Sequence, residues 1–216
     1  MEKRQIRRSR HKMLVTKVEP VTKTKYRVEL DQQFAFVLYK GELAKFSIRE
    51  MEEIPEEQYE KIRTEVILKR AKLRAMHLLT DMARTERGLR EKLKQGMYPE
   101  DLIDAAIDYV KSFGYLDDDC YAEQFVESRK GTKSKKEIRA LLLQKGICAE
   151  KIDQALEKCW QEEDSTEAIR ALIRKKRVDL SQASDLEIQR LYGFFWRKGF
   201  RFEDVRQVIQ NYNENA

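Results

Sequence analysis

The chain has 216 residues, of which 41% are hydrophobic and 38% are charged, with only eight glycines and three prolines. This length is enough to bury a core, and the composition favours amphipathic helices over sheets or disorder. Because there is no apolar run of about eighteen residues and no apolar segment behind the basic N-terminus, we expect neither a membrane span nor a secretory signal, and therefore a cytoplasmic protein.

The net charge of +6 is concentrated in the first twelve residues, which carry +5 and leave +1 for the remainder. Cations on a flexible segment can follow a charged surface, so residues 1–12 are predicted to be a basic tail that contacts phosphate groups or an acidic protein. The alternative is a disordered end that serves solubility only. The basic residues of this predicted tail are Lys3, Arg4, Arg7, Arg8, Arg10 and Lys12.

Residues 13–39 alternate in the manner of β-strands and are rich in Val, Thr, Tyr and Phe. We predict three short strands, Met13–Glu19, Thr24–Leu30 and Phe34–Tyr39, separated by turns at 20–23 and 31–33. They would form a small antiparallel meander, which together with a connecting helix makes up residues 13–62. Three short strands bury little surface, so this sheet should pack on the first helices or on a partner.

Helical periodicity begins near residue 42, and an internal repeat appears within it. Three glycines 50 and 53 residues apart, Gly96, Gly146 and Gly199, anchor three copies. Each copy has Leu or Trp three positions earlier (Leu93, Leu143, Trp196) and Glu four positions later (Glu100, Glu150, Glu203). Apolar residues at plus six, nine, ten and thirteen form one helix face in each copy: Leu102-Ala105-Ala106-Tyr109, Ile152-Ala155-Leu156-Cys159 and Val205-Val208-Ile209-Tyr212.

The repeat predicts a three-helix module. Glycine suits a left-handed residue that ends one helix, and glutamate suits the first turn of the next helix through the helix dipole and a capping box. A leading helix precedes each pair, at about Glu57–Met82, Asp117–Arg129 and Asp164–Arg177. The predicted fold class is mainly α, with modules at 63–115, 116–163 and 164–216 in an elongated curved array behind the small sheet.

The sequence contains no recognisable catalytic set, because two isolated histidines are accompanied by no metal, nucleophile or phosphate-loop motif. We therefore predict a protein that is not an enzyme and that uses no cofactor or metal. The run 117–119 is three aspartates at a predicted helix start, which favours helix capping over a metal site. The three cysteines lack CxxC spacing and are predicted to be buried free thiols.

Basic residues cluster near the middle helix of each module, and recurrence at equivalent places would align them into a stripe for phosphate or an acidic protein. Solvated helix faces are the alternative. Tyr115, Tyr121, Phe125, Trp160 and the run 194–196 have core spacing, which favours packing over base stacking. The clusters are Arg84, Arg87 and Arg90; Arg129, Lys130, Lys133, Lys135, Lys136 and Arg139; and Arg174, Lys175, Lys176 and Arg177, with Arg197, Lys198 and Arg201 further on.

The junction of the first two modules resembles the signature of the RecX family, G-Y-[LI]-D-D-x-x-Y-A-x-x-F-V-x-x-R. The resemblance covers about residues 63–213, with one departure at Gly88, where relatives often carry Glu. The matching residues are Gly114, Tyr115, Leu116, Asp117, Asp118, Tyr121, Ala122, Phe125, Val126 and Arg129.

The resemblance implies a regulator of the RecA recombinase in DNA repair, homologous recombination and the SOS response. Such proteins lie in the groove of the RecA filament on single-stranded DNA and inhibit its ATPase, strand-exchange and coprotease activities. The expected partners are the RecA filament and single-stranded DNA, with double-stranded DNA a further candidate, and the chain is expected to be a monomer. A direct DNA-binding repeat protein and a plain scaffold are the alternatives.

Overall fold

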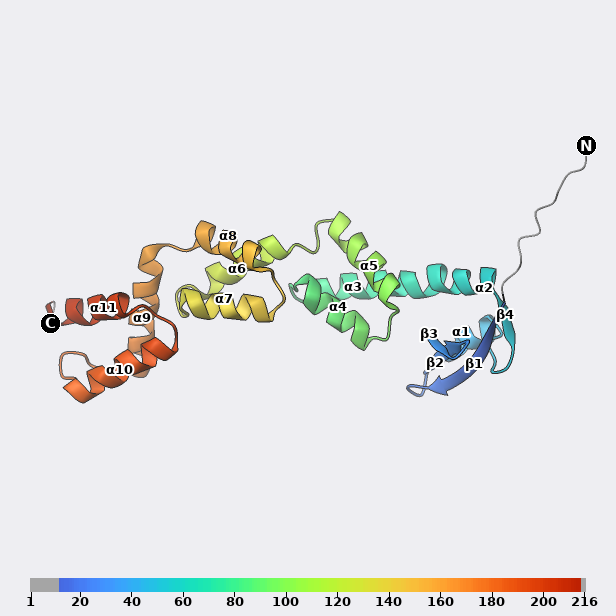
Figure 1. Ribbon diagram of the computed structural model, residues 1–216, viewed down its shortest axis with the longest axis horizontal. Coiled ribbons are helices and arrows are strands. Elements are labelled where there is room, and N and C mark those ends of the chain that lie inside the picture. The colour runs from blue at the N-terminus through green and yellow to red at the C-terminus, as the bar shows by residue number, and fades with distance from the viewer. Residues whose placement is uncertain (1–11, 215–216) are drawn as a thin grey trace, which may run out of the picture. The chain divides into compact units, whose positions relative to one another are not determined.

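The computed structural model describes residues 12–214, with side chains described as far as residue 211 (Figure 1). These residues form two compact units: 12–82 with 89–116 make unit 1, and 83–88 with 117–214 make unit 2. The predicted basic tail lies outside the described residues except for Lys12. That residue belongs to the first strand, where its ammonium lies 2.8 Å from Glu53, so its assignment to a tail is wrong.

The predicted antiparallel meander is confirmed in unit 1. Strands β1 (Lys12–Pro20), β2 (Lys25–Leu30) and β3 (Gln33–Tyr39) pair in sequence. A fourth strand, β4 (Glu53–Pro55), pairs antiparallel with β1, so the strand order is β3-β2-β1-β4. Three residues are too few for an alternating pattern to be seen in the sequence, which is why β4 was not predicted.

One face of this sheet packs on a helix of unit 1. Val28 and Phe36 are fully buried together with Ile62 and Ile67. Arg70 fastens the same helix to the sheet, because its guanidinium bonds to the Val37 carbonyl at 3.1 Å and to the carboxylate of Glu42 in α1 (Lys40–Lys45). The sheet therefore packs on the leading helix of the first module, as predicted.

That leading helix consists of three consecutive stretches, α2 (Glu56–Lys61), the π-helix η1 (Ile62–Leu68) and α3 (Lys69–Asp81). Residues at the two junctions have right-handed helical backbone, so the stretches follow one another without a break. Along this helix η1 contributes to the sheet core, whereas Ala71, Ala75 and Leu78 of α3 contribute to the core of the first module.

The three predicted three-helix modules are confirmed (Figure 1). The first comprises α3, α4 (Glu86–Gln95) and α5 (Glu100–Ser112). The second comprises α6 (Asp118–Arg129), α7 (Lys135–Gln144) and α8 (Ala149–Cys159). The third comprises α9 (Glu162–Lys176), α10 (Asp185–Arg197) and α11 (Phe202–Glu214). Each module has its own buried core, while elongation and curvature of the array stay predictions.

The glycine anchor of the first module was predicted one residue too early. The left-handed residue of its turn is Met97, with φ of 58°, and this matches Gly146 at 88° and Gly199 at 84°. Counted from Met97, the offsets six, nine, ten and thirteen give residues that are all fully buried: Ile103, Ala106, Ile107 and Val110.

The shifted register corrects two sequence predictions. Leu102 is buried like Ile152 and Val205, but it lies in the sheet core, so Ile103 is the equivalent position. Ala105 and Tyr109 are only half-buried. The apolar position before each turn was predicted three places before the glycine. The fully buried residues instead lie four places before the left-handed residue: Leu93, Leu142 and Phe195.

The glutamates of the repeat lie in the first turn of α5, α8 and α11, where the helix dipole favours a negative charge. The predicted capping box is wrong for α5 and α8. Their N-cap residues are Pro99 and Cys148, which provide no side-chain hydrogen bond.

Candidate interaction surface

The start of α4 belongs to unit 2, where it is held by a buried hydroxyl. Thr85 is 4% exposed, accepts the Gly88 N–H at 3.1 Å and donates to the Lys145 carbonyl at 2.8 Å. Ser134 does the same at the start of α7, since it accepts the Glu137 N–H at 3.0 Å and donates to the Lys198 carbonyl at 2.6 Å. We call these two contacts, Thr85 with Lys145 and Ser134 with Lys198, the joints between consecutive modules. In both joints the carbonyl that accepts the hydrogen bond precedes a left-handed glycine of the next module.

The glycines of these turns are required by close packing. A Cβ on Gly146 would lie 2.2 Å from Cδ of Arg87, and a Cβ on Gly199 would lie 3.0 Å from Cβ of Lys136. The aliphatic stems of Arg87 and Lys136 therefore cover the two glycines. Arg87 and Lys136, two members of the predicted basic stripe, therefore pack on neighbouring turns in addition to carrying a charge.

The third module offers an internal comparison for these joints. Ser184, the N-cap of α10, is exposed, and its hydroxyl donates to the Glu187 carboxylate at 2.8 Å. The Ser184 N–H also donates to this carboxylate, and these hydrogen bonds lower the pKa of Glu187. The same type of cap therefore exists here without a carbonyl acceptor from a following turn.

Two arginines of the predicted stripe form ion pairs inside their own modules. Arg90 pairs with Asp104, and Arg139 donates to Asp153 at 3.0 Å and 3.3 Å. The hydrogen bond from Arg139 lowers the pKa of Asp153, so the pair is charged at neutral pH. Each pair connects the middle helix of a module to the third helix.

Lys133 also has an ion-pair partner, because its ammonium pairs with Glu137 in the first turn of α7. Glu137 additionally lies 3.6 Å from the ammonium of Lys198. The equivalent position in the first module is Gly88, so this carboxylate is present at only one of the two joints.

Seven of the remaining predicted cations in unit 2 are exposed, and none of these seven has an ion-pair partner within 4.0 Å among the described residues: Arg129, Lys135, Lys136, Arg174, Lys175, Lys176 and Arg177. Lys135 and Lys136 lie in the first turn of α7, while Arg129 ends α6 with its guanidinium 5.8 Å from the Phe125 ring centroid. The other members of this group end α9: Arg174, Lys175, Lys176 and Arg177. Arg84 and Arg87, at the start of α4, are half-buried and exposed respectively.

A cavity of about 840 Å³ in unit 2 is lined by some of these cations. The residues around it include Lys135, Lys136 and Arg201 with the apolar side chains of Leu156 and Trp160. Carboxylates from Asp153, Glu162, Glu163 and Asp204 line it as well. Charges of both signs around an apolar floor suit a protein surface better than the uniformly negative phosphates of nucleic acid. We define these residues as the module 2–3 cleft.

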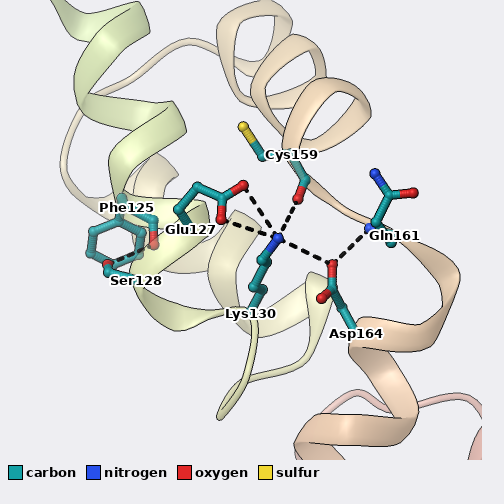
Figure 2. Close-up of polar contacts among 7 residues, drawn as sticks. All are labelled: Phe125, Glu127, Ser128, Lys130, Cys159, Gln161 and Asp164. Atoms are coloured by element: carbon teal, nitrogen blue, oxygen red, sulfur yellow. Dashed lines mark hydrogen bonds and ion pairs between the residues drawn. The ribbon is translucent and has the colours of Figure 1, made fainter.

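Lys130 is a structural residue and not a free cation (Figure 2). Its ammonium bonds to the Cys159 carbonyl at 3.2 Å and lies 3.1 Å from Glu127 and 3.8 Å from Asp164. Asp164 is buried and accepts the Gln161 N–H at 2.7 Å. The hydrogen bond to Glu127 raises the pKa of Lys130. The side chain therefore joins the ends of α6 and α8 to the start of α9.

Most residues of the family signature have structural roles. Asp117 caps α6 through bonds from the N–H groups of Asp119 at 2.8 Å and Cys120 at 3.1 Å, which confirms the capping prediction. Asp118 accepts the Glu86 N–H at 2.8 Å and so holds the start of α4. Leu116 is buried in the core of the first module, and Ala122 and Val126 are buried in the core of the second.

The predicted burial of the aromatic residues is only partly right. Phe195 is fully buried, and Tyr121, Phe125 and Trp160 pack on the core of the second module. Tyr115 and Trp196 are 57% and 73% exposed, so their assignment to the core is wrong. Helical spacing alone did not reveal that Tyr115 follows Gly114, a left-handed residue beyond the end of α5.

The cysteine prediction also needs correction, since Cys159 is buried but Cys120 and Cys148 are exposed. All three are free thiols. Across residues 12–214 the structure shows no cluster of three or more His, Cys, Asp or Glu side chains suited to a metal ion. In the same range no helix has the length and apolar character needed to cross a membrane.

Sequence reasoning missed three basic residues of α3. Lys69, Lys72 and Arg74 lie on this leading helix, and within the described part of the chain none of the three has an ion-pair partner. They were visible in the sequence, but the predicted stripe was built only around the middle helices.

A small sheet followed by three consecutive three-helix domains defines a tandem helical-repeat protein, a class that acts through its contact surfaces. Three family models match its modules in order. The first three-helix domain of RecX matches residues 71–109, the second matches 117–156 and the third matches 162–209.

Relatives match along nearly the whole chain. The regulatory protein RecX of Caldanaerobacter subterraneus subsp. tengcongensis is 32% identical over 91% of this chain and 98% of its own length. The regulatory protein RecX of Clostridium botulinum strain Eklund 17B is 27% identical over 91% of this chain and 94% of its own. The chain therefore belongs to the RecX family of regulatory proteins.

Solved structures agree with this assignment. A crystal structure of regulatory protein RecX has a TM-score of 0.58 at 27% identity and covers 91% of this chain and 98% of its own. A crystal structure of RecX from Lactobacillus salivarius has a TM-score of 0.57, covering 69% of this chain and 97% of its own, and at 21% identity it supports the fold alone.

Proposed function

We propose that this chain binds the filament that RecA forms on single-stranded DNA and inhibits its ATPase, strand-exchange and coprotease activities. The observation that carries the proposal is the match to all three RecX domains in order, together with full-length relatives that are regulatory proteins. RecX proteins regulate RecA, which makes RecA the expected partner of a member of the family.

The surface chemistry supports a protein partner. The module 2–3 cleft offers unpaired Lys135 and Lys136 beside apolar and acidic side chains. Such a mixture can form complementary charge pairs around an apolar contact, which favours correct partners and accelerates association. Three similar modules in one chain can also contact more than one protomer of a polymeric partner.

Inhibition then follows from differential binding. A regulator that contacts neighbouring recombinase protomers binds best to one geometry of the filament and therefore stabilises that geometry. ATP hydrolysis requires the filament to pass cyclically between geometries. The rate of turnover therefore falls by an amount set by the difference in the regulator's affinity for these geometries.

The second candidate is a direct DNA-binding protein without a recombinase partner. It is favoured by the exposed cations Arg129 and 174–177, which have no ion-pair partner among the described residues. Against it, the third helix of each module begins with acidic residues, which suit a phosphate groove poorly: Glu100 and Asp101, Glu150, and Glu203 and Asp204.

The test is the binding of fluorescently labelled chain to three targets, namely the RecA filament on single-stranded DNA, free RecA and bare single-stranded DNA. We expect the filament to be bound most tightly. Replacing Lys135 and Lys136 by glutamine should weaken filament binding about 2- to 30-fold, because each exposed charge pair is worth roughly 0.2–1 kcal/mol.

The control for that variant changes the net charge equally at another place. Lys23 and Lys61 are exposed residues of unit 1, and the double change to glutamine should leave filament binding nearly unaltered. If bare DNA is bound as tightly as the filament, the DNA-binding candidate replaces the proposal. If both double variants weaken binding equally, the cleft has no special part in it.

A further inference from the structure

Three aromatic side chains contact one another at the end of α5 in unit 1: Tyr109, which is half-buried, and Phe113 and Tyr115, which are exposed. The ring centroids of Tyr109 and Phe113 are 5.0 Å apart in an edge-to-face arrangement. Those of Phe113 and Tyr115 are 5.8 Å apart, and the two rings are within 15° of parallel. Phe113 is 56% exposed and Tyr115 is 57% exposed, so both residues are largely open to solvent.

The turn that carries these rings leaves room around them. Gly114 lies between Phe113 and Tyr115 with φ of 70°, and a Cβ built on it would meet no atom within 4 Å. Single exposed aromatic residues are common, whereas a contiguous exposed aromatic surface marks an interaction site. Phe113 and Tyr115 lie outside the core of the first module, whereas Tyr109 packs against it.

One cation lies next to these rings, and a second lies on the same face of α3. The ammonium of Lys72 in α3 is 4.5 Å from the Tyr109 ring centroid, and Lys69 is three residues earlier, on the same face of the helix. Neither lysine has an ion-pair partner among the residues that the structure describes. Flat aromatic faces beside unpaired cations are the combination with which proteins bind single-stranded nucleic acid.

We propose that Phe113 and Tyr115, with Lys69 and Lys72, form a binding site for single-stranded nucleic acid in the first module. An unpaired base stacks on the outer face of the Phe113–Tyr115 pair, and the lysines contact neighbouring phosphates. A protein anchor usually fills a pocket, whereas Phe113 and Tyr115 form an exposed, nearly parallel pair of rings, which favours a base over a protein side chain. Duplex DNA keeps its bases stacked on each other, so the site discriminates between single and double strands.

This site does not depend on the proposed regulation of RecA, because it is measured without recombinase. The probe is a labelled oligothymidine, which forms no structure of its own, beside a duplex of mixed sequence. The informative variant replaces Phe113 and Tyr115 by leucine, since leucine keeps an apolar side chain but has no ring. Circular dichroism confirms that the variant is folded.

We expect the leucine variant to bind oligothymidine at least about fivefold more weakly, because stacking of one base contributes about a 5- to 150-fold change in affinity. Duplex binding and the salt dependence should stay the same. Replacing Lys69 and Lys72 by glutamine should instead lower the slope of log affinity against log salt, by about 0.7 for each lost contact to a single strand.

The matched control is Trp196→Leu, which removes a single exposed ring of unit 2 and should leave oligothymidine binding unchanged. The proposal is overturned if the Phe113 and Tyr115 leucine variant binds oligothymidine like the wild type. It is also overturned if duplex binding falls equally. Loss of RecA filament binding with unchanged oligothymidine binding would identify the Phe113–Tyr115 pair as a protein contact.

Discussion

Replacing Ser134 by alanine tests the hydroxyl joint between the second and third modules. The Ser134 hydroxyl accepts the Glu137 N–H and donates to the Lys198 carbonyl at 2.6 Å, and the residue is 1% exposed. Loss of the cap costs about 1 kcal/mol, and an unsatisfied buried carbonyl costs a further 1–3 kcal/mol, so we expect roughly 2–4 kcal/mol in total.

Ser184→Ala is the matched control, because Ser184 caps α10 without donating to another module. Only the cap is lost there, so we expect about 1 kcal/mol. Ser134→Thr should retain most of the stability, since Thr85 performs the same task at the first joint.

The assay is urea unfolding followed by tryptophan fluorescence. Both tryptophans, Trp160 and Trp196, belong to unit 2, so the signal reports the unit that contains the joint. If Ser134→Ala destabilises unit 2 no more than Ser184→Ala does, the hydroxyl bond to the next module contributes nothing and the reasoning is refuted.

Three other predictions follow from the described contacts and from the sequence. Gly146→Ala should destabilise unit 2 by more than about 2 kcal/mol in the same assay, because it adds a Cβ at positive φ against Arg87, whereas Gly131→Ala, with nothing within 4 Å, should be nearly neutral. Burial raises the pKa of the Cys159 thiol, so at pH 8 it holds less thiolate and should react with Ellman's reagent more slowly than the two exposed cysteines; three equal rates would contradict this. If the basic tail contacts phosphates, removal of residues 1–11 should flatten the salt dependence of single-strand binding by about 0.7 per lost contact, and an unchanged slope would assign the tail to solubility.

Local patterns were sufficient to predict the three modules. Apolar residues at helical spacing identified the third helices, and left-handed glycines before them were correctly placed at Gly146 and Gly199. In the first module the left-handed position was predicted at Gly96, but its neighbour Met97 adopts positive φ. A sequence cannot show which of two neighbouring residues does so. Glycine is favoured there, so the choice of Gly96 was reasonable and wrong by one position.

The joints could not be predicted, because they depend on residues 60 and 64 positions apart. A hydroxyl before a helix indicates a cap, but nothing local shows that it also bonds to a distant carbonyl. The same limit applies to the basic stripe. Arg90 and Arg139 have the charge expected of contact residues, yet each pairs with an aspartate fourteen positions later in its own module.

Exposure was the least predictable feature of the candidate sites. Tyr115 and Trp196 follow the spacing of core residues, but one lies beyond a helix end and the other lies on the exposed side of α10. Burial is decided by the neighbours that tertiary packing supplies, and periodicity gives only the face on which a side chain lies.

Single-strand-dependent ATP hydrolysis by RecA, measured at increasing amounts of this chain, tests the central claim most directly. We predict that turnover falls when the chain is present at less than one copy per RecA protomer, because three modules can engage more than one protomer. Added salt should weaken the inhibition, since exposed charges are screened over about 8–10 Å at physiological ionic strength. Unchanged turnover at a molar excess, while bare DNA is still bound, would contradict the account.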